Sequence, residues 1–350
     1  MMEPQISGEL MLQNQPDLRK STTFLRCIAI LLVINSHLDA LYPVPWLGTG
    51  GAMGNSLFFM LSSFGLLLSE KNRQQTFVEY YVKRIKRIYP AVWTSIMFLI
   101  LPIALYYHFT SPAFYQAYVH DFGLDNPLVF IGNIFFPPQD YWFLRALMFF
   151  YLVGFMFIRN YSSRKILVGL ISLVLLYVTF YLHIKKFSIF LAVEQLVEFK
   201  LVFYGLVFLL GLYFASISER IKYEGILDVV ALLVSIGLIY GHKYLMLRGI
   251  GSQFQFVQQV FIIPMLYYAL KVGQSPFIQN KIMAAPAISG VISLVGAMTL
   301  ELYIVHGPIR PIVHQYVHYF PENIFAFGLI VFPVSYLFYK ANRALASTVN

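Results

Sequence analysis

The sequence predicts an all-α protein, a polytopic membrane bundle of about ten transmembrane helices. Of its 350 residues, 59% are hydrophobic and only 12% are charged, and the mean hydropathy is +0.68. Soluble domains carry about 25% charged residues, twice this share, so this chain cannot surround one core with a wettable surface. Lipid can cover an apolar exterior instead. Apolar runs of spanning length recur along the chain, and the basic residues gather in alternate connections.

Apolar runs of about 17–25 residues predict the spanning helices. They fall at residues 22–40, 49–69, 91–108, 141–158, 166–183, 200–217, 226–241, 254–271, 288–306 and 323–340. No internal repeat of 20–50 residues is evident, so we expect one membrane domain, 21–341, between a short segment 1–20 and a tail 342–350. The first twenty residues are polar, and we expect no cleavable signal peptide there.

The distribution of Lys and Arg predicts the orientation. The connection after the second run is rich in them, whereas residues 41–48 and 109–140 contain none. Because basic residues mark the cytoplasmic side, both termini are expected there, which requires an even number of spans. The formal net charge of +9 then mostly reflects topology, and nucleic acid is not expected as a partner.

The single cysteine limits the chemistry of the chain. Because Cys27 is the one cysteine in the sequence, an intrachain disulfide framework and a cysteine metal cluster are excluded. We expect it to be a small apolar filler in the first span, and we predict no metal site.

The first span carries ionisable residues, which are costly in a membrane and indicate function. Arg26 and His37 are eleven residues apart, which is close to three helical turns, so they share one helix face about 16 Å apart along the axis. Asn35 accompanies His37, and Asp39 is expected to face the outer water layer. We therefore predict a protein-lined cavity along this face, with His37 in the outer half of the membrane.

Other spans have charged or titratable side chains at about the depth predicted for His37. His306 ends the ninth predicted span, with Glu301 about a turn and a half below it, and Arg145 follows Trp142 at the outer start of the fourth. An interhelical hydrogen bond is an equally good interpretation of His306, because a lone membrane histidine often has that role.

The segment 80–90 combines tyrosines with four basic residues in five positions, 83–87, and ends in Pro90. Arg84 and Arg87, at i and i+3, lie on one helical face and can grip a phosphate together. This predicts a cytoplasmic ligand with several phosphates. Anionic lipid headgroups are the alternative.

Five motifs, in order along the chain, resemble the membrane-bound acyltransferase-3 family. They are Arg26 with His37; Phe58-Phe59-Met60-Leu61-Ser62-Ser63-Phe64; Arg84, Arg87 and Pro90; Trp142-Phe143-Leu144 with Tyr151; and Tyr303-Ile304-Val305-His306. The resemblance covers the chain from about Arg26 to His306. Ser63 replaces the glycine usual in the family, Arg145 stands where many members have Glu, and no hydrolase-like domain is expected after the last span.

The resemblance implies transfer of an acyl group, usually acetyl, from cytoplasmic acyl-CoA to a hydroxyl of an acceptor at the outer face. It implies a bacterial inner or plasma membrane, and a surface glycan or glycolipid as acceptor. His37 would be the general base, because a neutral imidazole is available near pH 7. Arg84 and Arg87 would hold the CoA phosphates, and Arg26 and Ser62 would line the passage of the donor.

The remaining candidates, Trp142, Arg145, Glu301 and His306, are expected on the acceptor side. Direct transfer and a covalent acyl-histidine relay both fit these residues. A secondary transporter for a polar or anionic solute, using His37, Arg145 and Glu301, is the alternative function. Transporters often consist of two related halves, and no such duplication is evident in the sequence.

Overall fold

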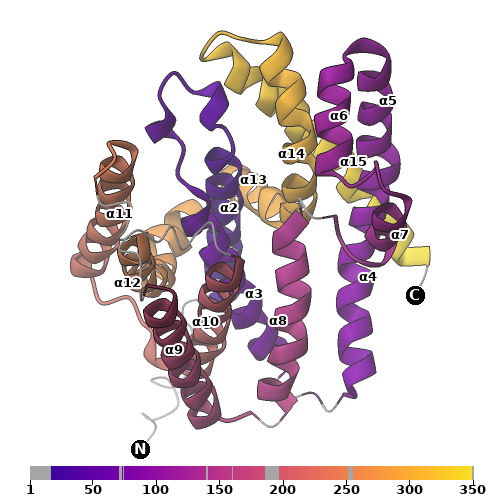
Figure 1. The fold of residues 1–350 in the computed structure, drawn as a ribbon. Helices are drawn as coiled ribbons and strands as arrows, with labels where there is room; N and C mark the ends of the chain where they lie inside the picture. The colour runs from indigo at the N-terminus through magenta and orange to yellow at the C-terminus, as the bar shows by residue number, and fades with distance from the viewer. Residues whose placement is uncertain are drawn as a thin grey trace, which may run out of the picture.

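A computed structural model describes residues 17–70, 73, 75–138, 141–159, 161–185, 197–250 and 255–348. Within these ranges all regular elements are helices, as the sequence predicts. The predicted segment 1–20 lies mostly outside the described residues, and so do the last two residues of the tail. Figure 1 shows the helices packed into one bundle.

The long helices follow the apolar runs. They are α2 (Leu18–Ser36), α3 (Gly51–Glu70), α4 (Phe77–Ser95), α8 (Trp142–Arg159), α9 (Ser163–Lys185), α10 (Val197–Ser216), α11 (Ile226–Leu247), α12 (Gln255–Gly273), α13 (Pro286–Ala297), α14 (Thr299–Tyr316) and α15 (Glu322–Thr348). In the described part, eight helical segments are long and apolar enough to cross a membrane, and the bent pair α13–α14 makes up to nine. Nine of the ten predicted spans therefore have a counterpart among these candidates.

The predicted span 22–40 corresponds to α2, which is not among these candidates and ends at Ser36. Arg19, Lys20 and Arg26 lower its apolar content. It packs against α3, α12, α13 and α14 in the middle of the bundle (Figure 1). A helix enclosed by other helices does not need an apolar surface on every side.

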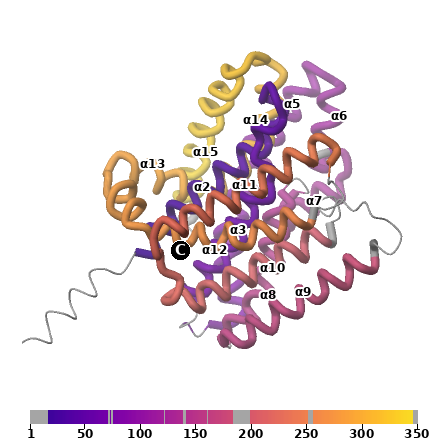
Figure 2. Tube along the Cα trace, turned by 90° about the vertical axis from the view of Figure 1, so that its left-hand side faces the viewer, coloured from indigo at the N-terminus to yellow at the C-terminus, as the bar shows by residue number. Residues whose placement is uncertain are grey.

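Helices α9 and α11 lie on the outside of the bundle. Only 6% of the α9 span and 17% of the α11 span are buried inside the protein. Their exposed surface is apolar, with side chains such as Leu175, Leu182, Leu227 and Leu233 more than 60% exposed, as expected for helices in contact with lipid. Figure 2 shows α9, α10 and α12 side by side, with α3 next to α10.

The basic segment 80–90 is helical and not part of a connecting loop. Helix α4 begins at Phe77 because Thr76 and Glu79 form a capping box: the Thr76 hydroxyl accepts from the Glu79 backbone N–H, and the Glu79 carboxylate accepts from Thr76 N–H. The helix continues through Pro90 and, by one π-helical turn, into α5 (Leu101–Thr110). The whole spanning segment is thus 34 residues long, from Phe77 to Thr110, and begins fourteen residues before the predicted boundary at 91.

The predicted ninth span, 288–306, is two helices. Helices α13 and α14 meet at Met298 with a bend of 70°. Because α14 continues to Tyr316, His306 lies within a helix and not at the end of one. The connection 109–140 also contains helices, α6 (Pro112–Asp121) and α7 (Pro127–Phe135), with α6 folded back on α5 (Figure 1).

Candidate active site

Two histidines from opposite ends of the sequence lie against each other. His37 caps the end of α2, and His306 projects from α14, which packs on α2. Nε2 of His306 is 3.3 Å from Nδ1 of His37, and the ring centres are 4.9 Å apart. His306 is only 3% exposed. The imidazoles therefore form one pair, which we call the histidine pair.

The backbone fixes which nitrogen of each ring carries the proton. Nδ1 of His37 lies 2.9 Å from the carbonyl oxygen of Val33, and Nδ1 of His306 lies 3.0 Å from that of Leu302. A carbonyl oxygen only accepts, so in the neutral rings Nδ1 is the protonated atom and Nε2 holds a lone pair; this assignment rests on the partners.

This tautomer gives the two rings different roles. The Nδ1–H of His37 is shared between Val33 O and Nε2 of His306. Nε2 of His37 makes no hydrogen bond within the described part of the chain, so its lone pair is free to accept a proton. If His37 becomes an imidazolium, the lone pair of His306 still accepts from its Nδ1–H and stabilises the charge.

Helix α14 and the loop after α2 hold the end of α2 in place. Nη1 of Arg310 donates to the His37 carbonyl oxygen over 3.3 Å. Nδ2 of Asn35 donates to Leu47 O over 3.2 Å, and Asn35 Oδ1 accepts from the Tyr42 hydroxyl. The predicted companion of His37, Asn35, thus ties the end of α2 to the loop that follows.

A polar cavity of about 420 Å³ lies between α2, α3, α4 and α8. All four predicted donor-binding residues line it: Arg26, Ser62, Arg84 and Arg87. The structure thus brings residues of the first three motifs together around one space, although His37 of the first motif does not line it.

The charges in this polar cavity are not equivalent. Arg84 Nη2 forms an ion pair with Glu70 Oε1 over 2.9 Å, and both side chains are nearly buried. The Arg84 guanidinium also lies 4.2 Å from the centre of the Tyr80 ring. Arg26 and Arg87 have no ion-pair partner among the described residues. The sequence predicted that Arg84 and Arg87 bind a phosphate together. Because Glu70 already neutralises Arg84, the charge of Arg84 is not available to a phosphate in the way that the charge of Arg87 is.

A narrower space continues the polar cavity toward the histidine pair. This space, about 70 Å³, shares Ser62, Arg87, Tyr151 and Thr299 with the polar cavity and reaches Tyr303. The Tyr303 ring centre is 5.7 Å from that of His306. The two spaces together therefore extend from the arginines to Tyr303, whose ring lies beside His306.

The other predicted acceptor-side residues do not gather at the histidine pair. Trp142 packs against Phe59 and Tyr204, with Lys200 Nζ 3.7 Å from its ring centre. Glu301 is buried, and its Oε1 accepts from Nδ2 of Asn342 over 3.2 Å.

Arg145 points away from the histidine pair. Its Nε donates to the Pro137 carbonyl oxygen, and it lines a separate pocket on the other face of α8. The side chains that α8 turns toward the narrow space are Phe143, Leu144, Leu147 and Tyr151.

Sequence reasoning left out Glu70 and Thr299, and it named Lys83 and Tyr151 without giving them a place at the site, although all four line the polar cavity. One signal was available. Thr299, Tyr303 and His306 stand at i, i+4 and i+7, the spacing of one helix face. In the part of the chain that the structure describes, no three His, Cys, Asp or Glu side chains are grouped to hold a metal ion.

The comparisons with known proteins agree with one another. The family model described as "Acyltransferase domain" matches residues 20–340. A putative acetyltransferase, ORF330, of Acidianus two-tailed virus is 33% identical over 162 residues, 45% of this chain and 46% of that protein. The peptidoglycan O-acetyltransferase OatA of Listeria monocytogenes serovar 1/2a is 27% identical over 171 residues, 42% of this chain and 26% of that protein. The matches thus span less than half of either relative, and no solved structure gives a significant match.

Proposed function

The chain belongs to the acyltransferase-3 family, whose model spans residues 20–340, and from that premise we propose that it is a membrane O-acetyltransferase. It takes an acetyl group from cytoplasmic acetyl-CoA and places it on a hydroxyl of a glycan or glycolipid outside the cytoplasm. The names of the two relatives, an acetyltransferase and a peptidoglycan O-acetyltransferase, support the type of reaction.

The observation that carries this proposal is that the polar cavity and the narrow space together reach from the arginines to Tyr303, the neighbour of His306. Arg26 and Arg87 line the polar cavity and form no ion pair in the described part of the chain, which suits the phosphates of CoA. The narrow space then leads past Ser62 to Tyr303, whose ring lies beside His306. Arg26 and His37 are about 16 Å apart along α2, counting ~1.5 Å for each residue. A long, thin donor with an anionic end and a reactive end fits such a route.

The chemistry at the histidine pair follows from the tautomer. His37 Nε2 takes the proton from the acceptor hydroxyl as its oxygen attacks the thioester carbonyl of acetyl-CoA. His306 Nε2 accepts from the Nδ1–H of the resulting imidazolium and stabilises it. When the carbon–sulfur bond breaks, His37 returns the proton to the CoA thiolate. The products are the acetyl ester and free CoA, and His37 is neutral again.

The proposed location is a cell membrane with both chain termini in the cytoplasm, because basic residues crowd the connections on that side. Membership in the acyltransferase-3 family favours the enzyme over the alternative transporter. The two functions also differ in a simple requirement. An acetyltransferase consumes acetyl-CoA, whereas a transporter moves its solute without it.

The test is mass analysis of surface glycans from cells with and without the chain, and from cells with the His37→Ala variant. We expect O-acetyl groups only with the wild-type chain. Purified full-length protein in lipid vesicles should release the CoA thiol from acetyl-CoA when the glycan from chain-free cells is added. Unchanged acetylation in all three cell lines, together with no CoA release, would overturn the proposal.

A further inference from the structure

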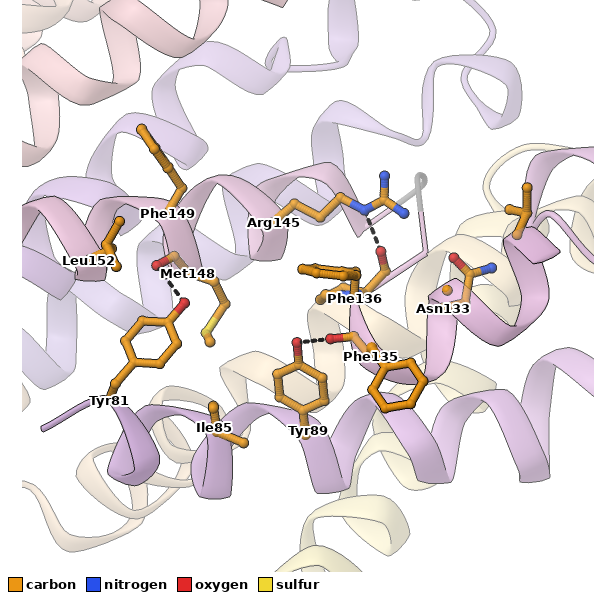
Figure 3. A pocket seen from close by; sticks show the side chains of 13 residues that line it. Tyr81, Ile85, Tyr89, Asn133, Phe135, Phe136, Arg145, Met148, Phe149 and Leu152 are labelled. Atoms are coloured by element: carbon orange, nitrogen blue, oxygen red, sulfur yellow. Dashed lines mark hydrogen bonds between the residues drawn. The ribbon is translucent and has the colours of Figure 1, made fainter. Parts of the chain in front are cut away.

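A second large cavity lies outside the proposed catalytic route. This side pocket, about 640 Å³, is formed by α4, α7, α8 and the two residues that follow α7, Phe136 and Pro137. Figure 3 shows Tyr81, Ile85 and Tyr89 of α4 facing Arg145, Met148 and Leu152 of α8. Helix α8 separates the side pocket from the narrow space, because the two are lined by different faces of this helix.

Hydrogen bonds between the surrounding elements fix the walls of the side pocket. The Tyr81 hydroxyl donates to Met148 O over 3.2 Å, which joins α4 to α8. The Tyr89 hydroxyl donates to Phe135 O, and Trp93 Nε1 donates to Ile134 O over 2.8 Å. These two bonds attach α7 to α4. The walls of the side pocket are therefore fixed, and the hydroxyl groups of Tyr81 and Tyr89 already donate hydrogen bonds within the protein.

Arg145 supplies a positive charge that no acid pairs with among the described residues. Its Nε donates to Pro137 O, which anchors the guanidinium (Figure 3). Within the described part of the chain its two terminal nitrogens make no hydrogen bond and no carboxylate forms an ion pair with it. A half-buried guanidinium of this kind favours an anion, and its planar fork matches the oxygens of a phosphate.

Asn133 supplies an unused acceptor. It is 2% exposed, lines the side pocket, and donates from Nδ2 to Phe122 O over 2.9 Å. Because a carbonyl oxygen only accepts, the amide nitrogen must face Phe122, which leaves Oδ1 for the side pocket. Oδ1 is buried and has no hydrogen-bond partner among the described residues. In Figure 3 this oxygen is turned to the side on which Arg145 lies. A ligand that fits must therefore bring a donor as well as an anion.

The remaining walls are apolar. Phe149 and Leu152 are 55% and 44% exposed and continue the side pocket along α8. From Arg145 to Leu152 the helix rises about 10 Å, so an acyl chain can lie along it. The polar residues are at the end of α8 where Tyr141 donates to Ile304 O, which is also the end near the histidine pair.

We propose that the side pocket binds an anionic glycerophospholipid whose headgroup carries hydroxyls, such as phosphatidylglycerol. Its phosphate contacts the terminal nitrogens of Arg145, a headgroup hydroxyl donates to Asn133 Oδ1, and an acyl chain follows Phe149 and Leu152. The lipid reaches this site from the bilayer, on the same side of the membrane as the histidine pair. This inference does not depend on the proposed reaction.

The test is native mass spectrometry of the full-length protein in detergent with three lipids of equal chain length. Phosphatidylglycerol has the charge and the hydroxyls, phosphatidylethanol has the charge alone, and phosphatidylcholine is zwitterionic. We expect phosphatidylglycerol to be retained at least tenfold more than phosphatidylcholine, and several-fold more than phosphatidylethanol. Arg145→Gln should lower its retention to the level of phosphatidylcholine.

Arg159→Gln is the matched control, because Arg159 is an exposed arginine at the other end of α8. It should leave retention unchanged. Equal retention of phosphatidylcholine and phosphatidylglycerol, or wild-type retention by Arg145→Gln, would overturn the site. Equal retention of phosphatidylethanol and phosphatidylglycerol would overturn the role given to Asn133 and the headgroup hydroxyl. Comparing lipids tests this oxygen without a change at Asn133, whose replacement would also remove its bond to Phe122.

Discussion

Nε2 of His306 accepts a hydrogen bond from Nδ1 of His37 over 3.3 Å, although 269 residues separate the two in the sequence. The same Nδ1 donates to Val33 O, so the proton of His37 is held on the side that faces His306. The other nitrogen, Nε2, remains available as a base. This relationship is the basis of the first two predictions.

Replacing His37 by Ala should abolish acetyl transfer while the protein still inserts into the membrane. General-base catalysis contributes about 10²–10⁴-fold, so we expect a loss in that range. His37→Gln should be nearly as inactive, because an amide is not a useful base. Transfer rates are measured with equal amounts of membrane-inserted protein. A loss under tenfold would contradict the role of His37.

Replacing His306 by Ala should lower kcat and leave KM for acetyl-CoA nearly unchanged, because this ring acts through His37 and does not hold the donor. A hydrogen bond to a charged group is worth about 1.5–3 kcal/mol, which corresponds to about 10- to 150-fold in rate. His306 is thus a positioning residue. A rise in KM with an unchanged kcat would show instead that it contacts a substrate.

Replacing Arg87 by Ala should weaken acetyl-CoA binding, because Arg87 lines the polar cavity and forms no ion pair among the described residues. Loss of one charge-assisted hydrogen bond predicts about 1.5–3 kcal/mol, seen as a higher KM or Kd. Lys86→Ala is the matched control, since Lys86 is an exposed neighbour that does not line the polar cavity. Equal effects of the two variants would point to general surface charge.

Replacing Arg84 by Ala should chiefly destabilise the protein. It would leave the carboxylate of Glu70 buried and unpaired, and breaking a buried ion pair costs about 3–5 kcal/mol. The unfolding temperature in detergent should fall, and the double variant Arg84→Leu with Glu70→Leu should recover much of it. An unchanged unfolding temperature, together with weakened acetyl-CoA binding, would show that Arg84 binds the donor directly.

Donor and acceptor should reach the protein from opposite sides of the membrane. In sealed vesicles of known orientation, acetyl-CoA should be consumed only on the face that bears the chain termini, and acetylated product should appear on the other. The reason is that the polar cavity is lined by the basic face of α4, while the histidine pair lies at the far end of α2. An impermeant acceptor that works only from the acetyl-CoA side would contradict this arrangement.

The sequence by itself determined the fold class and most of the helices. Spanning length and low charge are local properties of a segment. An apolar helix of that length is stable in a bilayer whatever its neighbouring helices are. The family resemblance of the motifs in the sequence implied that Arg26, Ser62, Arg84 and Arg87 belong together, and they do line one cavity. Helix ends were less predictable, because the capping box at Thr76 outweighed the charge of the segment that follows it.

Only the tertiary structure decided the partners of the polar side chains. Glu70 neutralises Arg84, His306 meets His37, and Arg145 turns to the other face of α8. Each depends on how two helices pack and rotate against each other, and on the 70° bend before α14. Residues far apart in the sequence meet through this packing, and the hydropathy along the chain does not predict which of them meet.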